Sequence, residues 1–299
     1  MDRTPHLFGG DWTTQKLDSL KKYLTAYTTA LKYTKFRLAY IDAFAGTGYR
    51  SNPKSKPKDQ PAEDPLFQIP VPEGEDPQEF LDGSARIALQ VEPRFHKYFF
   101  IERNKKRCQE LEKLKDEFPD KRDDIIVKQE EANAYLQKFC RTIDWATRRA
   151  VLFLDPYGMQ VEWETIKAIG ETKSIDLWIL FPLGIGVNRM VTKDGQINDA
   201  WRRKLDIMFG DTGWYDEFYK ESVSQDLFGE KTGIEKVANF DSIGQYFVGR
   251  LKTAFYQVVE NPRPLYNSRN IPLFLLCFAT GNAKGAPIAM RIADHILKG

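Results

Sequence analysis

The stretch that decides the fold is YIDAFAGTG, residues 40–48. It predicts a buried strand that ends at the Asp42 carboxylate and opens into the tight Gly46-x-Gly48 turn. This order is typical of a nucleotide-cofactor loop at the carboxyl end of the first strand of an open α/β sheet, because glycine lets the backbone approach a ligand closely. We therefore take Asp42, Phe44, Gly46 and Gly48 as candidate cofactor-binding residues. Ordinary turns also contain Gly-x-Gly, so the prediction depends on the strands that follow.

The second predicted strand, residues 97–102, is apolar and aromatic and ends in Glu102. An acid at this position suits the two hydroxyls of a ribose, although Glu102 would also fit a solvated strand end. The strand lies further from the glycine turn than the roughly 20 residues of a compact dinucleotide motif. The extra length lies in residues 51–82, whose prolines and charges predict a flexible, exposed insertion. A helix is expected to resume near Ser84, with that serine as its N-cap.

Asn133 follows the third predicted strand, residues 124–128, at the start of a helix. In a nucleoside-binding sheet this loop faces the base, so Asn133 is a candidate for contact with the cofactor. Asn at a helix start is also typical of a cap, and the sequence leaves both readings open.

The fourth predicted strand, residues 150–154, ends in Asp155-Pro156-Tyr157-Gly158. Its apolar run is long enough to be buried on both faces, as in a parallel sheet. The tip brings together a carboxylate, a proline carbonyl and an aromatic ring. Two acceptors can hold an exocyclic amino group while a ring stacks on a flat base. Asp155, Pro156 and Tyr157 are therefore the candidate catalytic residues.

Strands alternate with helical segments from residue 40 to the end of a fifth strand, 176–181. This alternation predicts a mostly parallel, doubly wound α/β sheet. Near the end of the chain, 264–266 and 272–279 flank a polar turn, which predicts a hairpin whose last strand is antiparallel. Five parallel strands and a terminal antiparallel hairpin are the arrangement of Rossmann-like class I methyltransferases that depend on S-adenosyl-L-methionine (SAM), an inference from fold analogy. We expect one such domain over residues 1–299.

Two segments lie outside the predicted sheet. Residues 13–31 place leucines and a tyrosine on one stripe, which favours an amphipathic helix that covers the sheet over one that binds a partner. Residues 188–240 have helical character, with many aromatic and basic side chains. We predict a helical insertion there. Its composition fits substrate or partner recognition, including nucleic-acid contact, as well as it fits a small local core.

Several stretches together resemble the three-Cys-motif partner (TcmP) family. They are FGGDWTTQKL (8–17), DAFAGTG (42–48), FIE (100–102), LDPYG (154–158) and FATGN (278–282), and they span nearly the whole chain. The resemblance implies a methyltransferase-like Rossmann domain in a prokaryotic or phage protein. It also implies a partner protein with a three-cysteine motif, of a metal-binding or radical-SAM type.

The tip of the fourth strand carries a separate resemblance. Asp155-Pro156-Tyr157-Gly158 is similar to the Asp-Pro-Phe-Gly of tRNA guanine-N2 methyltransferases, and more loosely to the Asp-Pro-Pro-Tyr of amino methyltransferases. The second proline of the latter motif is missing here, so the geometry of its amino-group acceptors does not carry over directly.

Bulk composition limits the function only weakly. The chain has 44 basic and 42 acidic residues, so its charge neither indicates a nucleic-acid partner nor excludes a local basic face. Cys108, Cys140 and Cys277 form no CxxC or Cys/His cluster, which argues against a disulfide framework and against a metal site. No apolar run is long enough for a membrane span and the N-terminus lacks a signal-peptide core, so we expect a cytoplasmic protein without a membrane partner.

From these features we predict a SAM-dependent methyltransferase that modifies an exocyclic amino group of a nucleobase in nucleic acid. The alternative is a non-catalytic or accessory module that binds a nucleoside cofactor, or none, and partners a three-Cys-motif protein. An NAD-dependent enzyme is a third reading, which the terminal hairpin and the Asp-Pro-Tyr-Gly tip disfavour.

Overall fold

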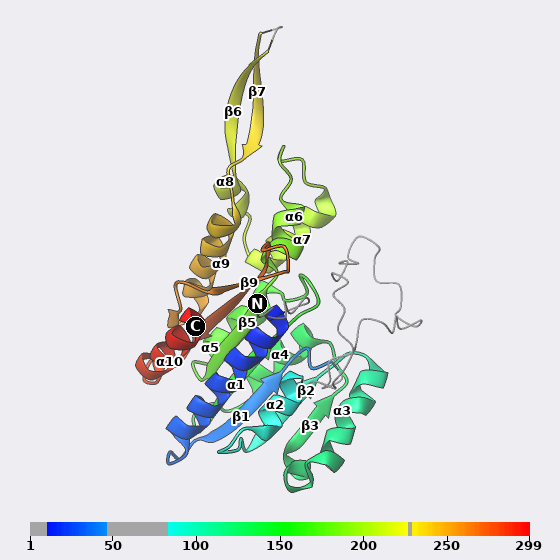
Figure 1. The fold of residues 1–299 in the computed structure, drawn as a ribbon, viewed down its shortest axis with the longest axis vertical. Helices are drawn as coiled ribbons and strands as arrows, with labels where there is room; N and C mark the ends of the chain where they lie inside the picture. The colour runs from blue at the N-terminus through cyan, green and yellow to red at the C-terminus, as the bar shows by residue number, and fades with distance from the viewer. Residues whose placement is uncertain (1–10, 47–82, 227–228) are drawn as a thin grey trace, which may run out of the picture.

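A computed structural model describes residues 11–46, 83–226 and 229–299 of the chain. It shows a central, mostly parallel β-sheet with helices on both faces (Figure 1). The predictions made for Gly48 and for the insertion at 51–82 lie outside the described residues, as do residues 8–10 of the first resembling stretch.

The sheet order is β3-β2-β1-β4-β5-β10-β8, and β9 also pairs with β10. The first five strands run parallel to one another, whereas β10 is antiparallel to β5, β8 and β9. The predicted terminal antiparallel strand and the predicted fold class are therefore confirmed. The strands are β1 (Arg37–Asp42), β2 (Lys97–Ile101), β3 (Ile125–Lys128), β4 (Arg148–Leu154), β5 (Ile175–Phe181), β8 (Gln257–Val258), β9 (Arg263–Tyr266) and β10 (Pro272–Thr280).

Each face of the sheet has its own hydrophobic core, because successive strand residues point to opposite faces. On β1, Tyr40 packs in the core under α1, while its neighbour Ile41 packs in the core under α5. Both side chains are fully buried. The first face is covered by α1 (Asp11–Leu31), α2 (Ser84–Gln90), α3 (Lys105–Glu117) and α10 (Ala286–Lys298), and the second by α4 (Ala132–Thr142), α5 (Trp163–Glu171) and α9 (Phe240–Ala254).

The segment 188–240 is only partly helical. It contains α6 (Asn188–Met190), α7 (Asp199–Phe209) and α8 (Trp214–Phe218), as predicted. The prediction is wrong for β6 (Tyr219–Asp226) and β7 (Gly229–Lys236), which pair as an antiparallel hairpin that projects from the body of the protein (Figure 1). These strands are largely polar, and a two-stranded ribbon away from the core needs no continuous apolar face. The sequence therefore lacks the period-2 pattern that marks a half-buried strand.

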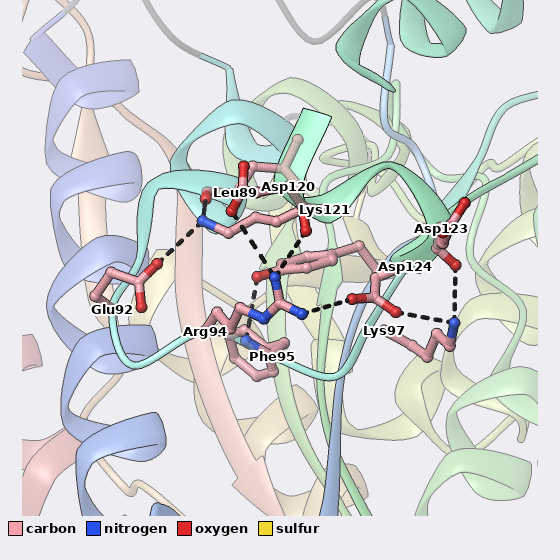
Figure 2. Close-up of polar contacts among 10 residues, drawn as sticks. Leu89, Glu92, Arg94, Phe95, Lys97, Asp120, Lys121, Asp123 and Asp124 are labelled. Atoms are coloured by element: carbon pink, nitrogen blue, oxygen red, sulfur yellow. Dashed lines mark hydrogen bonds and ion pairs between the residues drawn. The ribbon is translucent and has the colours of Figure 1, made fainter. Parts of the chain in front are cut away.

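Figure 2 shows the polar network that joins the loop before β2 to the 3₁₀ helix Pro119–Asp124. The buried Lys121 Nζ donates to the Leu89 carbonyl at 2.6 Å, and Lys97 Nζ donates to Asp124 Oδ1 at 3.0 Å. Arg94 reaches the same Asp124 carboxylate at 3.1 Å. Because β2 begins at Lys97 and β3 at Ile125, these contacts fix the amino ends of both strands, at the opposite edge of the sheet from Asp42.

Candidate functional site

Three acidic residues meet at the carboxyl edge of the sheet. Asp42 is the last residue of β1 and pairs with Phe100 of β2 and Phe153 of β4. Glu102 and Asp155 each lie two residues beyond these pairing partners, just past their own strands. Parallel neighbouring strands thus bring the three side chains to one edge, where ligands bind in open α/β sheets.

Asp42 is completely buried and hydrogen-bonded. Its Oδ2 accepts from Ser84 Oγ at 2.5 Å and from the Tyr40 hydroxyl at 3.3 Å, and its Oδ1 accepts from the Phe44 amide at 3.3 Å. Burial raises the pKa of Asp42 to about 7, and the nearby charge of Asp155 adds to this effect, while the hydrogen bonds oppose it. Asp42 therefore changes its charge near neutral pH.

Ser84 does not have the role that the sequence predicted for it. The N-cap of α2 is Gly83, which makes no side-chain cap, and Ser84 is the first helical residue. Its hydroxyl instead donates to Asp42, and this hydrogen bond joins the start of α2 to the end of β1.

The turn after β1 requires glycine at Gly46 for a conformational reason. Its φ is +62°, in the left-handed region that glycine adopts without strain. A Cβ at this position would lie 3.9 Å from the Tyr157 hydroxyl, an ordinary contact, so backbone conformation and not space is the constraint. Phe44, earlier in the turn, is half-buried and packs against the core under α4 and α5.

Glu102 is only 8% exposed, so it is not the solvated strand end that the sequence left open. Its Oε1 accepts from the backbone amide of Asn104 at 2.7 Å, and its Oε2 lies 3.7 Å from an Arg107 guanidinium nitrogen. The Arg107 guanidinium in turn lies 5.1 Å from the centre of the Tyr157 ring. Arg107 therefore connects the predicted ribose-binding acid with the predicted stacking ring.

Asn133 belongs to the protein's own framework. Its side-chain Nδ2 donates to Glu131 Oε1 at 2.9 Å and to the Gln160 carbonyl at 2.8 Å. Its oxygen accepts from the Glu162 amide at 3.0 Å and from Thr165 Oγ1 at 2.9 Å. All its hydrogen-bonding capacity is thus used within the protein. The helix cap itself is Glu131, so neither reading of Asn133 from the sequence, base contact or cap, describes what its side chain does here.

The three predicted catalytic residues at the tip of β4 differ in their exposure to solvent. Asp155 is partly exposed and accepts a hydrogen bond at Oδ2 from Lys16 of α1. Pro156 is buried, and Tyr157 is 58% exposed. An exposed ring beside a carboxylate leaves both groups accessible to a flat, amino-bearing ligand.

Sequence reasoning missed Lys16, Ser84 and Arg107. Only Lys16 carried a signal, because it lies four residues before Leu20 and seven before Tyr23, on the apolar stripe of the first helix. A lysine in such a stripe breaks the hydrophobic pattern.

Carboxylates at the ends of β1 and β2 suit the cationic and hydroxyl groups of a nucleoside cofactor such as SAM. Among the described residues, Glu102 Oε2 contacts Arg107 in the 3.7 Å ion pair, which leaves this oxygen able to accept from a ribose. Within residues 11–46, 83–226 and 229–299 there is no group of three or more His, Cys, Asp or Glu side chains that could hold a metal ion. Across the same ranges, no helix combines the length and apolar character that crossing a membrane requires.

No protein-family model and no curated protein matches this chain. Among solved structures, it is similar to a Legionella pneumophila protein of the DUF519 family, with 16% identity, a TM-score of 0.39, and 82% of this chain and 93% of that chain covered. A proposed SAM-dependent methyltransferase from Listeria monocytogenes shows 12% identity and a TM-score of 0.38 over 90% and 97% of the two chains. A proposed methyltransferase from Escherichia coli shows 11% identity and a TM-score of 0.31, with 73% of this chain and 87% of that chain covered.

Proposed function

We propose that this protein is a SAM-dependent methyltransferase that modifies an exocyclic amino group of a nucleobase in nucleic acid. The observation that carries the proposal is the convergence of Asp42, Glu102 and Asp155 at the carboxyl edge of the sheet, with the exposed Tyr157 ring beside them. A ligand-binding crevice at this edge is a general property of open α/β sheets. The acids give it acceptors for a cationic cofactor and for an amino group.

For the cofactor, Glu102 would hold the ribose hydroxyls, and the charge of the buried Asp42 would attract the positively charged amino-acid part near the Gly46 turn. Burial raises the pKa of Asp42 to about 7, and a cation bound nearby would lower this pKa by favouring the ionised form. SAM supplies an electrophilic methyl group when bound. Asp42 and Glu102 would bind and orient the cofactor and take no part in the transfer itself.

For the target, the Asp155 carboxylate and the Pro156 carbonyl would accept hydrogen bonds from an amino group and turn its lone pair toward the methyl donor. Tyr157 would stack on the base, which is worth roughly 1–3 kcal/mol at other sites of this kind. Such a transfer depends on alignment, charge complementarity and exclusion of water, so it needs no strong base.

We propose as a second candidate an accessory module that partners a three-Cys-motif protein, as the family resemblance implied. The specific observation in its favour is the β6–β7 hairpin, which stands off the body of the protein (Figure 1). Val223 and Ile234 in the hairpin and Val237 just after it are 65%, 45% and 52% exposed. An isolated two-stranded hairpin is marginally stable in water, so a partner that covers it would stabilise it.

Two measurements test the proposal. Mass spectrometry of the purified protein should find co-purified SAM or its demethylated product. Tritiated SAM incubated with total RNA and with genomic DNA should label one of the polymers, with or without a three-Cys-motif protein. If neither polymer is labelled, with or without the three-Cys-motif protein, the proposal of a nucleic-acid methyltransferase is wrong and the accessory module is favoured.

A further inference from the structure

Lys16 is a buried cation in a largely apolar face of α1. It shares the stripe of α1 that carries Leu20, Tyr23 and Tyr27, and it is 6% exposed. Lysine is almost never this buried without a partner. A residue that breaks the local pattern of its helix is expected at a functional or strained site.

The partner of Lys16 is Asp155, 139 residues away in the sequence. The Lys16 ammonium contacts Asp155 Oδ2 and lies 4.9 Å from the centre of the Trp12 ring. No described residue donates a hydrogen bond to the other oxygen, Oδ1, and the Asp155 side chain is 24% exposed. One oxygen of the carboxylate is therefore held by α1, and no described residue donates to the other, on a side chain that is partly exposed.

The ion pair also changes the charge of the site. Asp155 lies close enough to Asp42 that its charge raises the pKa of Asp42. Two neighbouring carboxylates repel each other, and Lys16 supplies the compensating charge. The Lys16–Asp155 pair is neutral overall, so an amino group that docks at Oδ1 meets an acceptor without an excess negative charge.

We propose that Lys16 is a positioning residue, which holds Asp155 so that Oδ1 accepts from a neutral exocyclic amino group and disfavours a protonated amine. This inference rests on the function proposed above and makes helix α1 part of the target site. A neutral nucleobase amine can donate to Oδ1 at no electrostatic cost, whereas a lysine-type ammonium would place a second positive charge beside Lys16. During transfer the nitrogen–carbon bond forms as the carbon–sulfur bond breaks, and the nitrogen then loses its extra proton to solvent as the methylated product leaves the site.

The test compares Lys16→Met, Lys16→Gln and Lys16→Arg with Lys22→Met, an exposed position on the same helix. Calorimetry gives the SAM affinity, tritium transfer to total RNA and to DNA gives kcat and KM, and thermal unfolding gives the folded fraction. We expect Lys16→Met to keep its SAM affinity within twofold and to lose roughly tenfold to hundredfold in kcat per folded molecule. Lys16→Arg should recover most of that loss, and Lys22→Met should match the wild type. If Lys16→Met does not fold, Lys16→Gln, which retains a hydrogen-bond donor, takes its place.

Two outcomes would overturn this role alone. The first is an active wild type whose Lys16→Met and Lys16→Gln variants keep full kcat. The second is transfer by the wild type to poly-L-lysine at a rate comparable with its transfer to nucleic acid. A wild type that binds SAM and labels neither polymer would instead overturn the proposed function, and the role of Lys16 with it.

Discussion

The Ser84 hydroxyl donates a 2.5 Å hydrogen bond to Asp42 Oδ2 and so joins the first turn of α2 to the last residue of β1. The two residues are 42 positions apart in the sequence, and Asp42 is completely buried. The contact stabilises the carboxylate at the centre of the candidate cofactor site, since a hydrogen bond to the charged form favours that form.

Replacing Ser84 should therefore destabilise the protein. Ser84→Ala leaves a buried carboxylate oxygen with one donor fewer, which costs about 1–3 kcal/mol. The free energy of unfolding from urea titration measures this loss. Ser268→Ala, at an exposed position in the β9–β10 turn, is the matched control and should change stability little. Equal stability of the two variants would show that the Ser84 contact is not formed in solution.

The buried carboxylates predict how stability changes with pH. Burial raises the pKa of Asp42 to about 7 and that of Asp176 to about 6, whereas an unfolded aspartate titrates near about 3.9. The folded state thus binds more protons between these values. The contribution of each group to stability is complete below about pH 4 and is lost as the pH rises through 6 and 7.

Asp42→Asn should therefore flatten this part of the pH profile. Each unit of pKa difference corresponds to about 1.4 kcal/mol, so relative to the wild type the variant should be more favoured at pH 8 than at pH 5. Melting temperatures measured between pH 5 and pH 8 check this. Parallel profiles for wild type and variant would mean that Asp42 titrates normally in the folded protein.

A close approach between α7 and α5 predicts a strong effect of a single methyl group. Gly210 has a φ of +70°, and a Cβ there would lie 1.9 Å from Cδ1 of Trp163. Gly210→Ala combines backbone strain of about 1–2 kcal/mol with this overlap. It should lower the melting temperature clearly.

Gly249→Ala is the contrasting variant. It lies within α9, where a Cβ would meet nothing within 4 Å. Alanine is favoured over glycine in a helix by roughly 0.5–1 kcal/mol, so this change should raise stability slightly. If the two alanine variants melt at the same temperature, the packing of Trp163 against Gly210 is not as described.

The sheet could be predicted from the sequence because its strands are long apolar runs. Asp42, Glu102 and Asp155 could be predicted as site residues because each acid lies at the end of such a run. The residues that contact these acids could not be predicted from the sequence. Lys16 meets Asp155 across 139 positions, and Ser84 meets Asp42 across 42. No local pattern encodes contacts of this kind, since tertiary packing decides which face of a helix meets which strand end.

Asn133 illustrates a different limit. Asparagine near a helix start can cap, bind a ligand or connect segments, and all three uses look alike in sequence. The four hydrogen bonds of its side chain, two of which reach Glu162 and Thr165 near the start of α5, became apparent only from the packing of α4 against α5.

Glu102 should matter for cofactor binding. Glu102→Ala removes a charged acceptor that would take two ribose hydroxyls, so SAM affinity should fall by about 1–3 kcal/mol. Calorimetry with folded protein measures this directly. Glu110→Ala, which changes an acid on α3 whose ion pair with Lys113 is solvent-exposed, is the control. Unchanged affinity in the Glu102 variant would exclude this placement of the ribose.

Asp155 should matter for methyl transfer more than for cofactor binding. Asp155→Asn keeps the shape of the side chain but removes the charge that accepts from the target amino group. SAM affinity should stay near that of the wild type, while transfer to nucleic acid per folded molecule should fall by roughly tenfold or more. Tritium incorporation and calorimetry on the same preparation separate the two effects.

The same variant also leaves the buried Lys16 without its anionic partner, and an unpaired buried charge is strongly destabilising. Stability must therefore be separated from chemistry, and Lys16→Met/Asp155→Asn does so, because it removes both charges. This double variant should be more stable than Asp155→Asn and equally inactive. If it instead regained transfer together with stability, Asp155 would serve only to hold the turn before Pro156, and the target amino group would need another acceptor.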